Sequence, residues 1–198
     1  MKILHIDSST TGGQSVTREL TKAIVDHFLA QHPDAAVTTL DLVLRPLPHL
    51  DPVSTAALRL PPEAQDEAMK VAYPVERAVF DQFVSSDIVV IGAPMYNFTI
   101  PSQLKVWLDR LALPGVAFSY SAAGPKGLAG GRRVIIASSQ GGMYGDGDPS
   151  EHQESLLRAF FGLIGIPDLE IIRADKIGFG PEARAASISQ AKAEIAKL

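Results

Sequence analysis

The segment that most constrains the fold is residues 88–110, which read IVVIGAPMYNFTIPSQLKVWLDR. It opens with an apolar run over residues 88–91, the pattern of a parallel strand buried on both faces. The run breaks at Gly92 and Pro94, and Pro101 then begins a helix at a position where a missing N–H has no cost. The segment therefore predicts a buried strand, a tight loop and a helix in direct succession.

The loop inside this segment has an unusual composition. Met95, Tyr96 and Phe98 offer a flat apolar stack, and Asn97 offers one polar fork. In open α/β sheets, ligands bind outside the carboxyl ends of the strands. The loop therefore suits a planar heteroaromatic ring with polar edges. The alternative is a strand–helix turn whose aromatic side chains belong to the core, and spacing alone favours neither.

The rest of the chain alternates between strand and helix patterns. Further strands are predicted at residues 2–7, 36–42, 132–138 and 169–174. Helices are predicted at residues 16–32, 63–84, 101–111, 150–164 and 181–197. Within the second of these helices, Pro74 is expected to start a new segment. Residues 45–62 are rich in proline and residues 112–131 in glycine, so both are expected to be irregular.

This alternation predicts an α/β fold with a five-stranded parallel sheet covered on both faces. The strand order 2-1-3-4-5 is common at this length and brings the ends of strands one, three and four together at the switch point. At 198 residues the chain is expected to form a single domain, residues 1–198.

Composition excludes several classes of protein. The formal charge is −4 without a basic tract, so a nucleic-acid partner is not expected. The chain has no cysteine, which excludes disulfides and cysteine chemistry. No apolar run approaches the roughly 20 residues of a membrane span, and an acid at Asp7 comes too early for a signal peptide. A cytoplasmic protein is expected, and since no histidine has metal-ligand spacing, no metal site is assigned.

The loop over residues 8–17 is rich in hydroxyls and glycine and runs into a helix N-terminus, which favours an anion. Ser9, Ser15 and Thr17 add hydroxyl donors. Neither G-x-x-x-x-G-K-[ST] nor G-x-G-x-x-G occurs, so an NTP loop and a dinucleotide turn are not supported. The loop suits a terminal phosphate monoester, and the alternative is ordinary helix capping by Ser or Thr.

The third loop, residues 139–142, contains Gly141 and Gly142, which let a ligand approach the backbone. Their N–H groups suit a developing negative charge, such as the N1–C2=O edge of a reduced flavin. The alternative is a simple turn, so the hypothesis depends on the three loops converging. We expect Trp107 to be a packing residue, and Arg110 to lie on a solvated or subunit-facing surface.

Four stretches together resemble a known family. They read GAPMYNFTIPSQLKVWLDR, GVAFSYSAAGPKGLAGGRRV, DSSTTGGQSVTREL and SSQGG. The chain closely resembles the bacterial FMN-dependent NADH-azoreductases, which are also NADH:quinone oxidoreductases, and the resemblance runs over essentially its whole length. The MYNFTIPSQLK run is its most specific part.

The resemblance implies a flavodoxin-like three-layer sandwich, a homodimer, one FMN per subunit and NADH as co-substrate. It also implies the residues that touch FMN. The phosphate residues are Ser9, Ser15, Val16 and Thr17, the isoalloxazine residues are Met95, Tyr96, Asn97 and Phe98, and the pyrimidine residues are Ser139, Gln140, Gly141 and Gly142. Two of these depart from the family pattern. Gln140 replaces a common basic residue and so lacks its charge, and Val16 replaces a small polar residue but keeps its backbone N–H.

The implied function is transfer of two electrons from NADH through the flavin to quinones and aromatic azo compounds. Hydride passes to flavin N5, so no protein group is named as catalytic. One domain leaves no second dinucleotide-binding unit, so both substrates are expected to use one slot in turn, with ping-pong kinetics. Phe118, Tyr120 and Tyr144 are candidate walls of the acceptor pocket, which in the family lies at the dimer interface.

Three alternatives stay open. A flavodoxin-type electron carrier shares the fold and FMN but has no NADH oxidase activity of its own. A hydrolase using Ser9 or a neighbour would need a triad, and no G-x-S-x-G elbow occurs. An NADPH-preferring reductase is also possible, because nothing in the sequence reads a 2′-phosphate.

Overall fold

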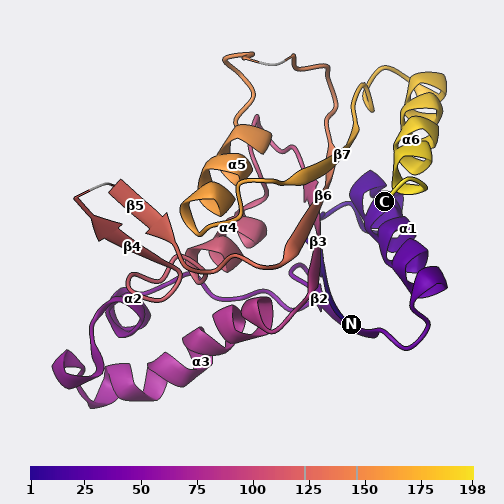
Figure 1. The fold of residues 1–198 in the computed structure, drawn as a ribbon. Coiled ribbons are helices and arrows are strands. Elements are labelled where there is room, and N and C mark those ends of the chain that lie inside the picture. Colours follow the sequence, from indigo (N-terminus) through magenta and orange to yellow (C-terminus); the bar gives the residue numbers. More distant parts are fainter. Residues whose placement is uncertain (123, 146) are drawn as a thin grey trace.

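The fold is built on a five-stranded parallel sheet (Figure 1). A computed structural model describes residues 1–122, 124–145 and 147–198. The strand order is β2 (Ala36–Asp41), β1 (Lys2–Asp7), β3 (Ile88–Pro94), β6 (Arg133–Ser139) and β7 (Glu170–Ala174). These are the five strands predicted from the sequence, in the predicted order, so the flavodoxin-like α/β sheet is confirmed.

The central strand β3 is buried at every residue, as its unbroken apolar run requires. It pairs in parallel with β1 on one side and β6 on the other. Asp7 of β1 lies opposite Gly92, and Pro94 lies opposite Ser139 of β6. The loops that follow these three strands therefore leave the same edge of the sheet.

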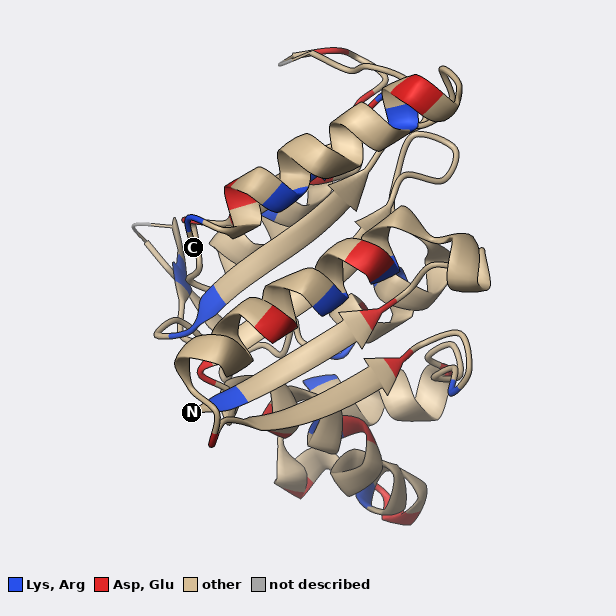
Figure 2. Cartoon of the chain, turned by 90° about the vertical axis from the view of Figure 1, so that its right-hand side faces the viewer, with Lys and Arg blue, Asp and Glu red and all other residues tan. Residues whose placement is uncertain are grey.

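Helices cover both faces of the sheet. Helices α1 (Val16–Gln31) and α6 (Pro181–Ile195) lie side by side over one face of the sheet (Figures 1 and 2). On the other side lie α2 (Pro52–Arg59), α3 (Glu67–Val84), α4 (Ser102–Asp109) and α5 (Glu154–Leu163) (Figure 1). Each face has its own apolar core, one centred on Leu20, Ile24 and Phe28 and the other on Trp107 and its neighbours. No helix of the described chain is long and apolar enough to cross a membrane.

The proline-rich residues 45–62 were predicted to be irregular, and this was wrong for α2. Asp51 caps the helix, and its side chain accepts a hydrogen bond from the backbone N–H of Ser54 at 2.7 Å. The Ser54 hydroxyl in turn accepts one from the N–H of Asp51, which completes a capping box. Pro52 stands at the first helical position, where proline is favoured rather than disruptive.

The expected break at Pro74 is also absent, since α3 runs as one helix from Glu67 to Val84. The buried residues of α3, Phe80 and Phe83, lie beyond the proline and anchor its C-terminal half in the core. Val71 and Val75, on either side of the proline, are 74% and 71% exposed. Tertiary anchoring at one end has therefore outweighed the local cost of proline.

The glycine-rich residues 112–131 contain an antiparallel hairpin that the sequence pattern did not predict. Its strands are β4 (Phe118–Ser121) and β5 (Gly124–Gly127). A side chain at Gly127 would collide with the backbone of Gly165, so glycine is required there for close packing rather than for a turn. The glycines of this segment therefore made a strand resemble an irregular loop in the sequence.

Two expectations about α4 had opposite outcomes. Trp107 is fully buried, which confirms its packing role. Arg110 was expected at a surface, but it is 1% exposed and its Nε lies 2.5 Å from Glu76 Oε2. Its Nη2 also donates to the carbonyl of Pro48 at 2.9 Å. The buried guanidinium therefore joins α4 to α3 and to the proline-rich segment.

Candidate functional site

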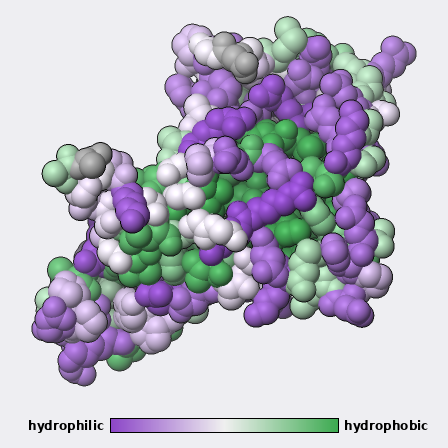
Figure 3. All heavy atoms as spheres, viewed as in Figure 1, coloured by the Kyte–Doolittle hydropathy of each residue, from purple (hydrophilic) through white to green (hydrophobic). Residues whose placement is uncertain are grey.

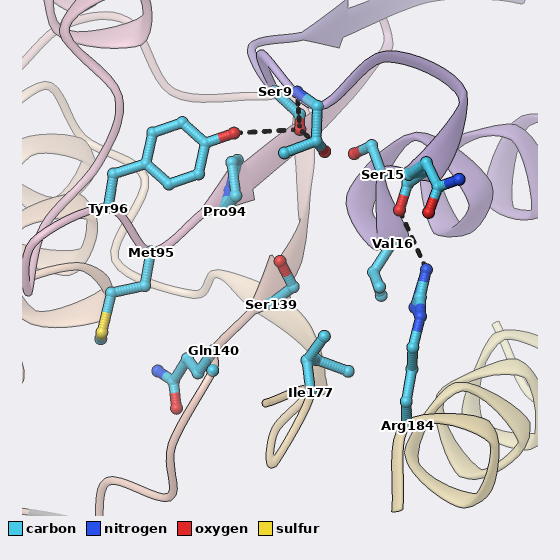
Figure 4. Close-up of a pocket in the computed structure, with 13 residues that line it drawn as sticks. Ser9, Ser15, Val16, Pro94, Met95, Tyr96, Ser139, Gln140, Ile177 and Arg184 are labelled. Atoms are coloured by element: carbon cyan, nitrogen blue, oxygen red, sulfur yellow. Dashed lines mark hydrogen bonds between the residues drawn. The ribbon is translucent and has the colours of Figure 1, made fainter. Parts of the chain in front are cut away.

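The loops after β1, β3 and β6 enclose a cavity of about 300 Å³ at the carboxyl edge of the sheet (Figure 4). This is the switch point of the strand order, where open α/β sheets place their ligands. The lining residues are Ser9, Thr11, Gln14, Ser15, Val16, Pro94, Met95, Tyr96, Ser139, Gln140, Gly141, Ile177 and Arg184. The convergence on which the sequence hypothesis depended is therefore present.

The first loop brings Ser15 and Val16 to this cavity at the start of α1, whereas Thr17 is fully buried behind them and does not line it. Ser15 caps the helix: its Oγ accepts from the N–H of Arg18 at 3.2 Å and lies 3.1 Å from the Thr17 hydroxyl. The backbone N–H groups of Val16 and Thr17 have no acceptor among the described residues. Two unpaired N–H groups at the positive end of a helix form a ready anion site.

Tyr96 joins the first loop to the second. Its phenol oxygen accepts from the backbone N–H of Thr10 at 3.0 Å and lies 3.2 Å from Ser9 Oγ (Figure 4). Burial by itself raises the pKa of the Tyr96 phenol, but hydrogen bonds from Ser9, Thr10 and Thr11 outweigh it and lower that pKa below its ordinary value. The hydroxyl of Tyr96 therefore fixes the position of the 8–11 segment.

Arg18 and Asp41 hold the same loop from the outside. The guanidinium makes a bidentate pair with Asp41 at 2.5 and 3.0 Å, and its Nη2 donates to the carbonyl of Ser9 at 3.0 Å. The hydrogen bond from Arg18 holds the pKa of Asp41 at about 2, with help from the backbone N–H groups of Leu44 and Val43. The loop is thus tied to the end of β2 by a charged pair.

The second loop contains a tight turn from Tyr96 to Thr99, whose backbones pair in both directions at 2.8 and 3.2 Å. Asn97 and Phe98 form its corner with φ values of 47° and 74°. A left-handed backbone is acceptable for Asn but strained for Phe. Both side chains are exposed and neither lines the cavity, whereas Met95 and Tyr96 do.

The third loop is held by a relay of neutral amides. Gln140 is 1% exposed, and its Nε2 donates to Gln153 Oε1 at 3.1 Å. Gln153 also accepts from the Ser138 hydroxyl at 3.2 Å and donates to the carbonyl of Ala93. The Gln140 amide nitrogen, an expected ligand donor, is therefore bound within the protein.

Glycine completes the third loop. The backbone N–H groups of Gly141 and Gly142 have no acceptor in the part of the chain that the structure describes. Gly141 lines the cavity, and an added Cβ there would meet no protein atom. Gly142 lies behind it under the Tyr144 ring, where a Cβ would be 3.3 Å from a ring carbon.

The three candidate acceptor walls do not reach the cavity of their own chain. Phe118 is 6% exposed and belongs to the core, with its ring 5.4 Å from that of Tyr120 in an edge-on arrangement. Tyr120 is 74% exposed on the hairpin. Tyr144 lines a separate hollow beside Arg173.

Sequence reasoning missed five lining residues: Thr11, Gln14, Pro94, Ile177 and Arg184. Two of them follow β7, whose loop pairs with the glycine loop. The Lys176 N–H donates to the carbonyl of Gly142 at 2.7 Å and that of Ile177 to Gln140 at 3.1 Å. The predicted sheet order already placed β7 beside β6, so the loop after β7 could have been predicted to border the cavity. Among the described residues, no cluster suited to a metal ion occurs.

Comparison with known proteins agrees with this geometry. A family model described as the flavodoxin-like fold matches residues 1–198, and a curated FMN-dependent NADH:quinone oxidoreductase from Methylocella silvestris is 48% identical over all of this chain and 98% of its own. The chain belongs to this flavodoxin-like family of oxidoreductases. A second relative with the same name, from Rhizobium meliloti, is 46% identical over all of this chain and 96% of its own. The family resemblance predicted from the sequence is confirmed.

Solved structures agree on the fold. The azoreductase of Bacillus anthracis strain Sterne superposes with a TM-score of 0.90 at 26% identity, covering all of this chain and 97% of that one. An FMN-dependent NADH-azoreductase from Bacillus anthracis strain Ames Ancestor, solved in complex with FMN, gives a TM-score of 0.85 at 23% identity, covering all of this chain and 99% of that one.

Proposed function

We propose that this chain is an FMN-dependent oxidoreductase that passes two electrons from NADH through the flavin to quinones and aromatic azo compounds. One observation carries the proposal. Unpaired N–H groups at the start of α1, which suit an anion, and the uncharged residues Met95, Tyr96 and Gln140, which suit a flat ring, lie around the same cavity at the switch point. Relatives 45–48% identical over their length are named FMN-dependent NADH:quinone oxidoreductases, which does not favour the carrier alternative.

The cavity residues fit FMN on their own chemistry. At one end, the hydroxyls of Ser9, Ser15 and Thr17 and the N–H groups of Val16 and Thr17 would hold the phosphate. At the other end, Met95 and Tyr96 on one loop and the residues from 139 to 142 on another would hold the ring. Asn97 and Phe98, which do not line the cavity, would lie at the outer rim of the ring. The twelve residues named from the family resemblance remain our proposal for the FMN site.

When bound, FMN would supply the hydride-accepting and electron-donating chemistry of the reaction. The protein's own contribution is position and electrostatics. The unpaired N–H groups of Gly141, which lines the cavity, and of Gly142 next to it would serve as donors for negative charge on the pyrimidine edge. Gln140, held by Gln153, adds a neutral dipole and no formal charge at that edge. Nothing in the chain is assigned as a general acid or base.

We also propose a cytoplasmic homodimer in which each copy is one domain folded as a three-layer sandwich. Phe118, Tyr120 and Tyr144 do not line the cavity of their own chain, so as acceptor walls Tyr120 and Tyr144 would serve a second copy, with the buried Phe118 supporting the Tyr120 ring from below. Tyr120 and Leu128 are exposed, and Figure 3 shows apolar surface where the β4–β5 hairpin leaves the body. These features support an interface on that side.

The proposal is tested on purified protein. We expect it to be yellow, to release FMN on heating, and to give parallel double-reciprocal lines with NADH and a benzoquinone, since both substrates use one slot. Colourless protein that takes up no FMN would refute the proposal. Intersecting lines would refute the shared slot, and FMN-loaded protein that does not oxidise NADH would favour the electron carrier.

A further inference from the structure

Arg184 of α6 is the one charged residue among those described around the cavity. Its guanidinium extends across from α6 to the first loop, and its Nη2 donates to the carbonyl of Gln14 at 2.9 Å (Figure 4). Its Nη1 is buried and has no hydrogen-bond partner among the described residues. The side chain therefore brings a positive charge and a spare donor to the start of α1.

The charge of Arg184 is not balanced by a carboxylate in the described chain, unlike that of Arg18. Arg18 lies on the outer side of the same loop, but its guanidinium is paired with Asp41 and lies 3.5 Å from Asp7. Lys192, on the same helix as Arg184, is paired with Glu19 at 2.7 Å. Of these three cations, Arg184 is the one that can balance a ligand's charge.

We propose that Arg184 is the electrostatic partner of the phosphate monoester and makes the site select FMN over unphosphorylated riboflavin. This inference rests on the proposed function. A phosphate monoester carries a charge of about −1.5 to −2 at pH 7, whereas the hydroxyls and N–H groups around it are neutral. Hydrogen bonds from these neutral groups to an ionised phosphate are already charge-assisted, but among the described lining residues Arg184 alone adds an opposite formal charge. The spare Nη1 donor gives the guanidinium a bond to offer beyond the Gln14 carbonyl.

The test separates charge recognition from loop positioning. Apoprotein is titrated with FMN and with riboflavin for the wild type, Arg184→Gln and Arg184→Lys. Glutamine keeps amide N–H donors but removes the charge. We expect Arg184→Gln to weaken FMN binding at least about tenfold and to change riboflavin binding less than about twofold. Lysine should recover part of the loss. Lys192→Met removes a cation from the same helix away from the cavity and should leave both affinities unchanged.

Three results would overturn the inference. Equal weakening of FMN and riboflavin binding in Arg184→Gln would mean that Arg184 only positions the first loop, and no weakening for either flavin would mean that it does not act at the site. An equal loss of FMN affinity in Lys192→Met would mean that any positive charge on α6 has the same effect. If Arg184→Gln fails to fold, Arg184→Lys alone decides, because a retained preference for FMN is expected and a lost one contradicts the inference. A wild type that binds neither flavin would instead refute the proposed function itself.

Discussion

Two corners of the same cavity are held in opposite ways. At the corner where α1 begins, a bidentate pair between Arg18 and Asp41 fixes the loop, and hydroxyls and a phenol surround its inner side. At the corner after β6, the relay through Gln153 uses only neutral amides and a hydroxyl. Formal charge is thus concentrated where the proposed ligand is charged, and only dipoles lie near its ring.

The difference teaches how a single cavity can favour one orientation of its ligand. Both corners have unpaired N–H groups, but only the corner where α1 begins adds the helix dipole and the charge of Arg184, so a phosphate is attracted there. The amide corner is instead rigid, because a fully buried Gln153 bonds to β3 and β6 at once. Removing single parts of each corner tests this division.

The largest effect on stability is expected at the amide corner. Gln153→Leu leaves the buried Ser138 hydroxyl, the Gln140 amide and the Ala93 carbonyl without this partner. We expect a loss of about 3 kcal/mol in the free energy of unfolding, measured with urea. Gln190→Ala, at an exposed position of α6, is the control and should change stability by less than about 0.5 kcal/mol. A loss of less than about 1 kcal/mol in Gln153→Leu would show that the hydrogen bonds of Gln153 contribute little to stability.

The second effect concerns binding at the same corner. Gly141→Leu places a side chain where an added Cβ meets no protein atom, so we expect normal folding. The side chain would occupy ring space and weaken FMN binding at least about 100-fold, or about 2.7 kcal/mol, in a fluorescence titration. Gly162→Leu, at an exposed and open position on α5, should bind FMN normally. Undiminished affinity in Gly141→Leu would remove this loop from the site.

The third effect concerns the charged corner. Arg18→Met should cost about 1–2 kcal/mol at pH 7, because it breaks a partly buried bidentate pair. The pKa of Asp41 is lowered from 3.8 to about 2, mainly by the hydrogen bond from Arg18, so this stabilisation is complete above about pH 5 and is lost as the pH falls toward 2. The difference between wild type and variant should therefore be smaller at pH 3 than at pH 7. Arg77→Met, which breaks a more exposed pair, should have little effect at either pH.

The smallest effect lies in the turn between the two corners. Phe98 has a strained φ of 74° and is 51% exposed. Phe98→Gly relieves the strain, whereas Phe98→Ala keeps it, so we expect the glycine variant to be more stable than the alanine variant by about 1 kcal/mol. Thermal unfolding compares the two. Equal stability would mean that the turn adapts without strain.

Strong local signals allowed much of this structure to be predicted from sequence. The apolar run of residues 88–91 and the alternation around it led to the five strands and their order. The loops of the switch point followed from that order. Prediction failed where tertiary contact overrides local preference, as at Pro74, where packing of Phe80 and Phe83 keeps one helix, and at Gly127, where glycine in a strand reflects contact with Gly165.

Side-chain direction was the other limit. Gln140 lines the cavity, but its amide nitrogen is bound by Gln153, which lies 13 residues later and had no distinguishing pattern. Arg184 was missed because nothing in a helix of low amphipathicity indicates which residue faces a distant loop. Such contacts depend on the packing of whole elements and cannot be read from spacing.

The central claim is that one cavity lets bound FMN exchange an electron pair with NADH and then with an acceptor. It is tested most directly by recording the visible spectrum of FMN-loaded protein without oxygen, adding one equivalent of NADH and then one of benzoquinone. The account predicts loss of the oxidised-flavin absorbance with NADH and its return with the quinone. Absorbance that persists in the presence of NADH would contradict it.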